Sequence, residues 1–191
     1  MIFVNDVSNH KEYKKTLLSR IEEYKKTHNS RMPKECMGET LVSDNEAYSN
    51  WLEVKEKRKS NHCMYSGHLL YDFFADKGIQ ELMGKIGKDL RMDMFTDFDW
   101  RLDIAWFQQY YANAAHHWHN HSDCQFTNVY FLELPNEDYK TEIIGLEGEL
   151  FSYEAKEGQM ITFPSYLQHR SKPNGNGRKT IISFNSSYQT G

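Results

Sequence analysis

Hydrophobic positions in the first half of the chain recur at the spacing of a helix. Between residues 11 and 26, apolar and aromatic side chains share one face, while lysine and glutamate occupy the other. Residues 43–59 repeat this pattern, and Ser43 with Glu46 has the spacing of a capping box. Both segments are therefore predicted to be amphipathic helices.

Two shorter helical segments are predicted next, at residues 69–74 and 79–86. We expect them to be broken at Gly78 and Gly87, because glycine readily adopts the left-handed conformation that ends many helices. The first ninety or so residues are thus predicted to be mainly helical.

From about residue 100 the pattern changes to short runs rich in aromatic and β-branched residues, bounded by proline and glycine turn signals. The runs are residues 104–111, 127–134, 143–146, 149–153, 160–163 and 180–184. Because no helical pattern separates the later runs, we expect antiparallel strands that close as a sandwich or barrel. The sequence therefore predicts one α+β domain over residues 1–191, with helical support in 1–95 and a β core in 96–191.

Composition narrows the setting of this domain. The 191 residues suit one domain, and no run approaches the roughly 18 apolar residues of a membrane span. The three cysteines are scattered and no secretory signal opens the chain, so a soluble protein of a reducing, cytoplasmic compartment is expected. A formal net charge of −4 gives no global electrostatic reason to expect a nucleic-acid partner.

Four of the nine histidines fall within the eight residues HHWHNHSD, at positions 116–123. A further histidine, His169, precedes a later strand. A His-x-Asp or His-x-His pair from one turn, joined by a distant histidine, can supply three ligands on one side of a metal and leave its other positions open. We therefore predict a metal site here.

The stretch EGQMITFPSYLQHRSKPNGNGRKTIISFN, residues 157–185, resembles the second half of the iron(II)- and 2-oxoglutarate-dependent oxygenases. WHNHSDCQFTNVYFLELP, residues 118–135, resembles the part of these proteins that carries the first two iron ligands. The similarity spans residues 100–185 and is strongest to prolyl-hydroxylase-like and small bacterial or phage members. It implies a double-stranded β-helix, or jelly-roll, core.

The resemblance also implies roles for single residues. His169 would bind iron, and Arg178, nine residues later, would form a salt bridge with the far carboxylate of 2-oxoglutarate. Two sets of ligands remain open: His121, Asp123 and His169 give the usual single carboxylate and are favoured, whereas His119 in place of Asp123 gives three histidines.

Further positions match the family less specifically. Thr180 lies two residues past Arg178, as in an arginine-x-serine/threonine pattern that contacts the co-substrate. Tyr110 or Tyr111 could offer a hydroxyl to 2-oxoglutarate, whereas Phe131 stands where several relatives have a second tyrosine.

The activity implied by the resemblance is hydroxylation of a substrate with iron(II), dioxygen and 2-oxoglutarate, which releases succinate and CO2. A small molecule or a protein side chain is the expected substrate, and a bacterial or phage-infected cell is the expected setting. The edges of a jelly roll and an aromatic-rich helical face would suit a homodimer. The alternatives are a cupin-type metalloenzyme that does not use 2-oxoglutarate and a metal-binding jelly roll without turnover.

Overall fold

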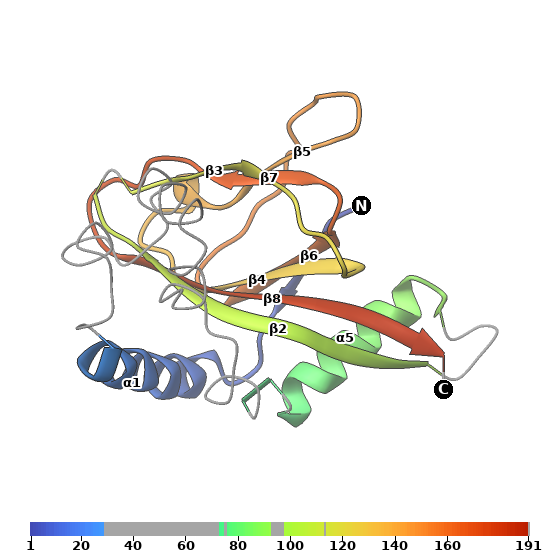
Figure 1. Ribbon diagram of the computed structural model, residues 1–191, viewed down its shortest axis with the longest axis horizontal. Helices are drawn as coiled ribbons and strands as arrows, with labels where there is room; N and C mark the ends of the chain where they lie inside the picture. Colours follow the sequence, from blue (N-terminus) through green and yellow to red (C-terminus); the bar gives the residue numbers. More distant parts are fainter. Residues whose placement is uncertain (29–72, 75, 93–97, 113, 191) are drawn as a thin grey trace.

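A computed structural model describes residues 1–28, 73–74, 76–92, 98–112 and 114–190 of the chain (Figure 1). Within these residues two α-helices, a short 3-10 helix and two antiparallel sheets form an α+β fold with a jelly-roll core. Figure 1 shows both helices on one side of the larger sheet and the smaller sheet on the other side. No helix in this part of the chain is long and apolar enough to cross a membrane.

The first predicted helix is confirmed as α1, His10–His28. Its buried residues Tyr13, Leu17 and Ile21 recur every four positions, so they form one stripe against the core. The helix predicted at residues 43–59 lies outside the described residues. Of the segment 69–74 only Phe73 and Phe74 are described, and both are helical and buried.

The expected breaks at Gly78 and Gly87 are wrong, because both glycines lie inside helix α5, Lys77–Asp89. The carboxylate of Asp76 accepts a hydrogen bond from the backbone N–H of Gly78 and so caps the start of the helix. Helix α5 ends at Leu90, and the left-handed residue that follows is Arg91, with φ 57°.

The larger sheet has the strand order β1-β6-β4-β8-β2, and the smaller sheet has the order β3-β7-β5. The larger sheet comprises β1 (Phe3–Asp6), β2 (Phe98–Tyr110), β4 (Phe126–Glu133), β6 (Gln159–Pro164) and β8 (Lys179–Thr190). The smaller sheet comprises β3 (His116–His119), β5 (Glu142–Ile144) and β7 (Gln168–Ser171). Every pairing is antiparallel, as the sequence predicted.

Five of the six predicted strands coincide with β2, β4, β5, β6 and β8. Residues 149–153 form no strand, and only an isolated bridge joins Leu150 to Ile144. The sequence reading missed β1, β3 and β7. Each has only four residues, and two of them are rich in histidine or other polar side chains, so their composition does not indicate a strand.

Alternate residues of β8 contribute to two separate hydrophobic clusters. Ile182 packs with residues of α1 and α5, whereas Ile181 packs with Phe163 and Leu167 between the two sheets. Successive strand residues point to opposite faces, so odd-numbered positions from 179 to 185 face the interior of the jelly roll. Even-numbered positions face the helices. This alternation decides which side chains can reach the candidate site.

Candidate metal centre

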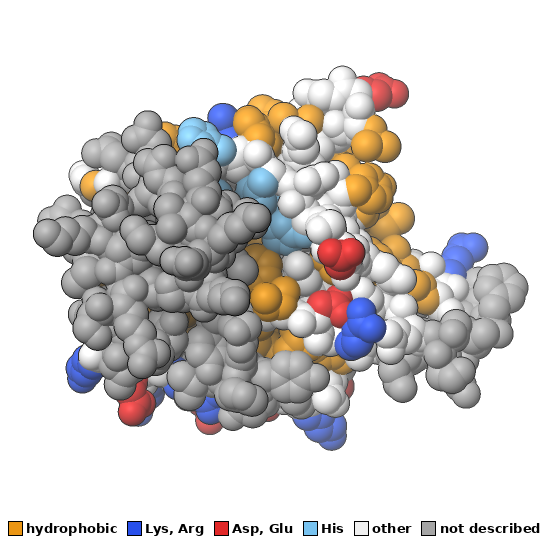
Figure 2. Space-filling model, in the orientation of Figure 1, with side chains coloured by type: hydrophobic (Ala, Val, Ile, Leu, Met, Phe, Trp, Pro, Cys, Tyr) orange, Lys and Arg blue, Asp and Glu red, His pale blue; other side chains and the backbone are white. Residues whose placement is uncertain are grey.

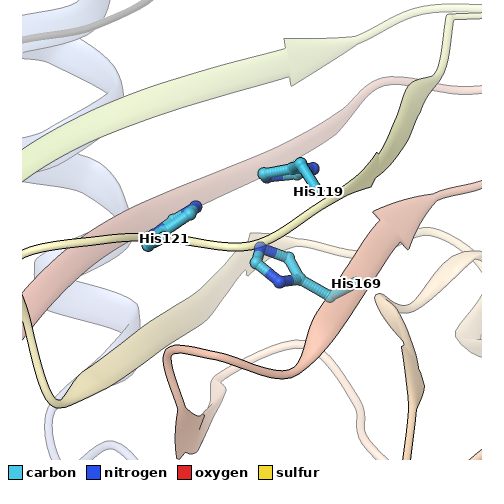
Figure 3. A group of neighbouring side chains, drawn as sticks. All are labelled: His119, His121 and His169. Atoms are coloured by element: carbon cyan, nitrogen blue, oxygen red, sulfur yellow. The ribbon is translucent and has the colours of Figure 1, made fainter.

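Three histidines from two segments of the chain meet inside the jelly roll. The ligand nitrogens of His119, His121 and His169 all lie within 4.8 Å of one another (Figure 3). His119 and His121 project in the same direction because they are two residues apart on an extended segment. His169, on β7, lies directly across from His119 in the strand pairing. The fold therefore creates a three-histidine cluster from residues 50 positions apart.

The Nδ1 atom of each histidine is held by an oxygen acceptor. Nδ1 of His119 lies 2.7 Å from the carbonyl oxygen of His117, Nδ1 of His121 lies 2.7 Å from Oδ1 of Asn185, and Nδ1 of His169 lies 3.2 Å from the carbonyl oxygen of Leu167. These oxygens accept hydrogen bonds, so Nδ1 carries the proton in each ring and Nε2 keeps its lone pair. Such bonds fix the orientation of metal-binding histidines.

Burial keeps the three rings neutral. It lowers the pKa of His119 to about 4, lowers that of His121, and lowers that of His169 well below its ordinary value. A neutral imidazole with a free Nε2 lone pair suits iron, nickel, copper or zinc. The donor set therefore fits iron(II), the metal that the family resemblance implied for this place.

Asp123 lies outside the cluster. After His121 the chain turns, and Asp123 adopts a left-handed conformation with φ 62° and an exposed side chain. Its carboxylate accepts a hydrogen bond from Ser122, 3.3 Å away. The structure thus brings together the alternative set with His119 and not the favoured set with Asp123, because the His-x-Asp stretch is a turn and not a strand.

Arg178 and Thr180 also lie away from the histidines, on the helix-facing side of the large sheet. Nε and Nη2 of Arg178 each donate to Glu133 over 2.8 Å, and Nη1 lies 3.3 Å from Glu22 of α1. Thr180 donates to the same Glu133 carboxylate. Hydrogen bonding to Glu133, with a contribution from Tyr111, raises the pKa of Arg178 above its ordinary value. These side chains join the sheet to α1, and none of them reaches the interior.

The basic residue that does face the interior is Lys179, which sequence reasoning missed. Its side chain is fully buried, and Nζ donates to Oγ of Ser171 and to the carbonyl oxygen of Tyr139, each over 2.6 Å. Burial lowers the pKa of Lys179 to about 7. Within the described residues no carboxylate lies within ion-pairing distance of this amine. Lys179 lies on the same face of the strand as Ile181, two residues away. The sequence does not show whether Ile181 or Ile182 faces the interior, so this spacing alone could not identify Lys179.

Tyr110 belongs to the interior, as its partner in the strand pairing is Lys179. Nζ of Lys179 lies 4.7 Å from the centre of the Tyr110 ring. Phe131 is buried in the same cluster between the sheets, and Trp106 lies 5.4 Å from the ring of His121. The interior therefore holds three neutral imidazoles, one buried amine and several aromatic walls.

Histidine side chains reach the surface on one face of the molecule, beside hydrophobic and acidic side chains (Figure 2). The rings of His119 and His121 are partly exposed, whereas His169 is buried.

No protein-family profile matches the chain, and the comparison with curated proteins gives no match. Solved structures do match. ThoJ, a non-heme monooxygenase in complex with nickel, is 9% identical with a TM-score of 0.59, and the match covers 98% of this chain and 74% of ThoJ. At this identity the likeness concerns the fold, and it extends over nearly the whole chain.

Two other matches have lower TM-scores. A 2OG-Fe(II) oxygenase family protein from Burkholderia pseudomallei is 13% identical with a TM-score of 0.49, and the match covers 64% of this chain and 56% of that protein. A viral collagen prolyl hydroxylase from Paramecium Bursaria Chlorella virus-1 is 16% identical with a TM-score of 0.41, covering 58% of this chain and 72% of the viral one.

Proposed function

We propose that the protein is an iron(II)- and 2-oxoglutarate-dependent oxygenase that hydroxylates its substrate. The observation that carries the proposal is the set of three neutral histidines with their Nε2 lone pairs free, next to a buried lysine in the same interior. Iron(II) and 2-oxoglutarate, when bound, would supply the redox chemistry by which dioxygen hydroxylates a C–H bond. His119, His121 and His169 would hold the metal.

Lys179 takes the role that the sequence resemblance gave to Arg178. Ser171, which accepts a hydrogen bond from Lys179, lies two residues from His169 on β7, or about 7 Å along the strand. A five-carbon keto acid can span such a distance, with the keto acid end at the metal and the far carboxylate at the amine. The low polarity around the amine strengthens its attraction to a carboxylate.

The rest of the interior would orient the co-substrate and exclude water. Tyr110 packs against Lys179, and Ile181, Phe163 and Leu167 form an apolar wall between the sheets. Such a wall keeps water from the reacting groups and strengthens the electrostatic contacts to the bound dianion. The protein's own contribution is therefore binding, orientation and shielding.

An anaerobic titration tests this proposal. The iron(II)-loaded protein is titrated with 2-oxoglutarate while the visible charge-transfer absorption of the iron and keto-acid chelate is followed. A band that rises to saturation at one equivalent supports the proposal. Stoichiometric iron binding without any band contradicts it.

A second candidate function is a three-histidine metalloenzyme that binds its substrate directly and does not use 2-oxoglutarate. The observation in its favour is the donor set, which contains no carboxylate among the described residues. In the same titration this alternative gives no response to 2-oxoglutarate. A substrate that binds directly to the metal would instead change the spectrum by itself.

For the substrate we propose a small molecule or a protein side chain. The net charge of −4 agrees with a partner other than nucleic acid. Release of succinate, measured against a panel of amino acids and peptides, tests the substrate class directly.

A further inference from the structure

The larger sheet continues past the metal cluster, and its inward face carries polar and charged side chains there. Figure 1 shows strands β2 and β8 running beyond the smaller sheet toward the C-terminus. Ser187 of β8 lies two residues beyond Asn185, which contacts His121, so both face the same way and are about 7 Å apart along the strand. The partner of Ser187 in the strand pairing is Arg101 of β2, which therefore shares this face. The fold thus brings an arginine to the rim of the metal site.

A carboxylate holds the guanidinium group of Arg101 in place and leaves its outer end open. Nε of Arg101 donates to Oδ1 of Asp103 over 2.5 Å, and Oδ2 of Asp103 accepts from the hydroxyl of Ser187 over 2.8 Å. The side chain of Asp103 is 13% exposed, whereas that of Arg101 is 50% exposed. Within the part of the chain that the structure describes, Nη1 and Nη2 of Arg101 make no hydrogen bond. Two such N–H donors can bind a carboxylate in a planar fork.

A second carboxylate stands at the same rim. The turn that removes Asp123 from the metal cluster leaves its side chain exposed here. The backbone N–H of Gln125, two residues further, donates to the hydroxyl of Ser187 over 3.3 Å. Burial raises the pKa of the Cys124 thiol, and the negative charges of Asp103 and Asp123 both add to this shift. The two carboxylates therefore lie near the same point.

The charges of this rim favour a ligand that carries both signs. Arg101 offers a cation to a carboxylate, but Asp103 and Asp123 together outnumber it. A ligand with a carboxylate alone would add to the excess of negative charge, whereas a ligand that also has an ammonium group would balance it. Figure 2 shows acidic and basic side chains on the same face as the histidines. A free amino acid has this combination of charges.

We propose that this rim binds a free amino acid as the substrate, with its carboxylate on Nη1 and Nη2 of Arg101 and its ammonium group on Asp123. Asp103 is a positioning residue, since it orients the guanidinium group. Both binding groups lie within a few residues of His121 or of its partner Asn185, so the carbon chain of the amino acid is within reach of the metal. The inference rests on the proposed function and names its substrate class.

The test is a binding measurement on protein that does not turn over. Nickel(II)-loaded protein is saturated with 2-oxoglutarate and titrated by calorimetry with each of the common L-amino acids in turn. The tightest ligand is then measured again as its carboxamide and as its N-acetyl derivative. Arg101→Gln and Asp123→Asn each remove one of the two charged partners.

The matched control is Arg170→Gln. Arg170 is also a partly exposed arginine whose Nε donates to a carboxylate, that of Glu142, over 2.7 Å. It follows the inward-facing His169 on β7 and so lies on the outer face of the smaller sheet. Its loss should leave the affinity for the amino acid at the wild-type value.

We expect the carboxamide and the N-acetyl derivative each to bind about 10- to 100-fold more weakly than the amino acid itself, because each loses hydrogen bonds to a charged group. Arg101→Gln and Asp123→Asn should weaken binding of the intact amino acid by a similar factor. Both variants should bind nickel(II) and 2-oxoglutarate as the wild type does, which shows that they are folded.

Wild-type protein that binds 2-oxoglutarate but no amino acid overturns the inference and leaves the proposed function intact. Unchanged amino-acid affinity in Arg101→Gln or in Asp123→Asn also overturns it. Loss of 2-oxoglutarate binding in Arg101→Gln does so too, because the arginine then supports the metal site and not the substrate. Wild-type protein that binds nickel(II) but not 2-oxoglutarate refutes the proposed function and the inference together.

Discussion

Arg178 and Lys179 are neighbours in the chain but lie on opposite faces of the large sheet. Arg178 pairs with Glu133 and Glu22 on the side of the helices, and Lys179 is buried between the sheets. Both are basic residues nine or ten positions beyond His169, so spacing along the chain does not show which of them could bind the co-substrate carboxylate. The direction of each side chain at the start of strand β8 distinguishes them.

This relationship predicts different effects for two substitutions. Lys179→Met removes a buried cation with little change in volume, and we expect it to weaken 2-oxoglutarate binding by at least about 30-fold, since losing one partner of a buried charge pair costs about 2–5 kcal/mol. Arg178→Gln should leave this affinity unchanged. Calorimetric titration of both metal-loaded variants measures the difference, and the opposite ranking would assign the anchor to Arg178.

Arg178→Gln should instead lower stability. Its guanidinium makes two hydrogen bonds to Glu133 and a further one to Glu22 of α1, so its loss leaves a partly buried carboxylate without its main partner. We expect the free energy of unfolding to fall by about 2 kcal/mol. Urea denaturation followed by circular dichroism measures this, and stability equal to wild type would show that the ion pair contributes nothing net.

Metal binding should depend on His119 and not on Asp123. Each of the substitutions His119→Ala, His121→Ala and His169→Ala removes one of the three ligands. Each should reduce bound iron(II) far below one equivalent after dialysis. Asp123→Ala should keep one equivalent, because the carboxylate is exposed and lies outside the cluster. Metal analysis of the four variants decides between the two ligand sets, and loss of iron in Asp123→Ala would support the His-x-Asp set.

Asn185 should affect the metal through His121. Its Oδ1 lies 2.7 Å from Nδ1 of His121, so the amide carbonyl fixes both the ring orientation and the tautomer. Asn185→Leu should lower metal affinity by about 10- to 100-fold, the usual effect of removing such a partner. Asn185→Asp, which keeps the acceptor, should retain most of the affinity. Equal losses in the two variants would mean that packing and not the hydrogen bond matters here.

Binding of 2-oxoglutarate should take up a proton above neutral pH. Burial lowers the pKa of Lys179 to about 7, so above pH 7 the free amine is mainly neutral, and a bound carboxylate raises its pKa again. Proton uptake should therefore grow, and affinity fall, as the pH rises from 7 toward 9. Calorimetry in buffers of different ionisation enthalpy measures the uptake.

The control for this experiment is Lys179→Met, in which the proton uptake should disappear. A wild-type affinity that stays constant between pH 7 and 9, with no proton uptake, would show that the amine is already charged before the co-substrate binds.

The sequence by itself determined the elements whose pattern is long and regular. Helix α1 and strands β2, β4, β6 and β8 each bury a continuous stripe of apolar side chains, and such a stripe can be read from the order of residues alone. The sequence also located the histidine-rich segment, because four histidines within eight residues are unusual. It located the distant partner His169 by its place before a later strand and by the resemblance of the surrounding stretch.

Only the tertiary structure decided which side chains meet. The turn after His121 moves Asp123 out of the cluster, and the pairing of β3 with β7 places His119 opposite His169. The register of β8 turns its first residue, Lys179, inward, since a shift of one residue reverses the face of every side chain on a strand. Arg178, just before the strand, lies on the side of the helices. These choices depend on strand pairing between segments far apart in the chain, where the hydrogen bonds of the sheets, and not local propensity, fix the position of each residue.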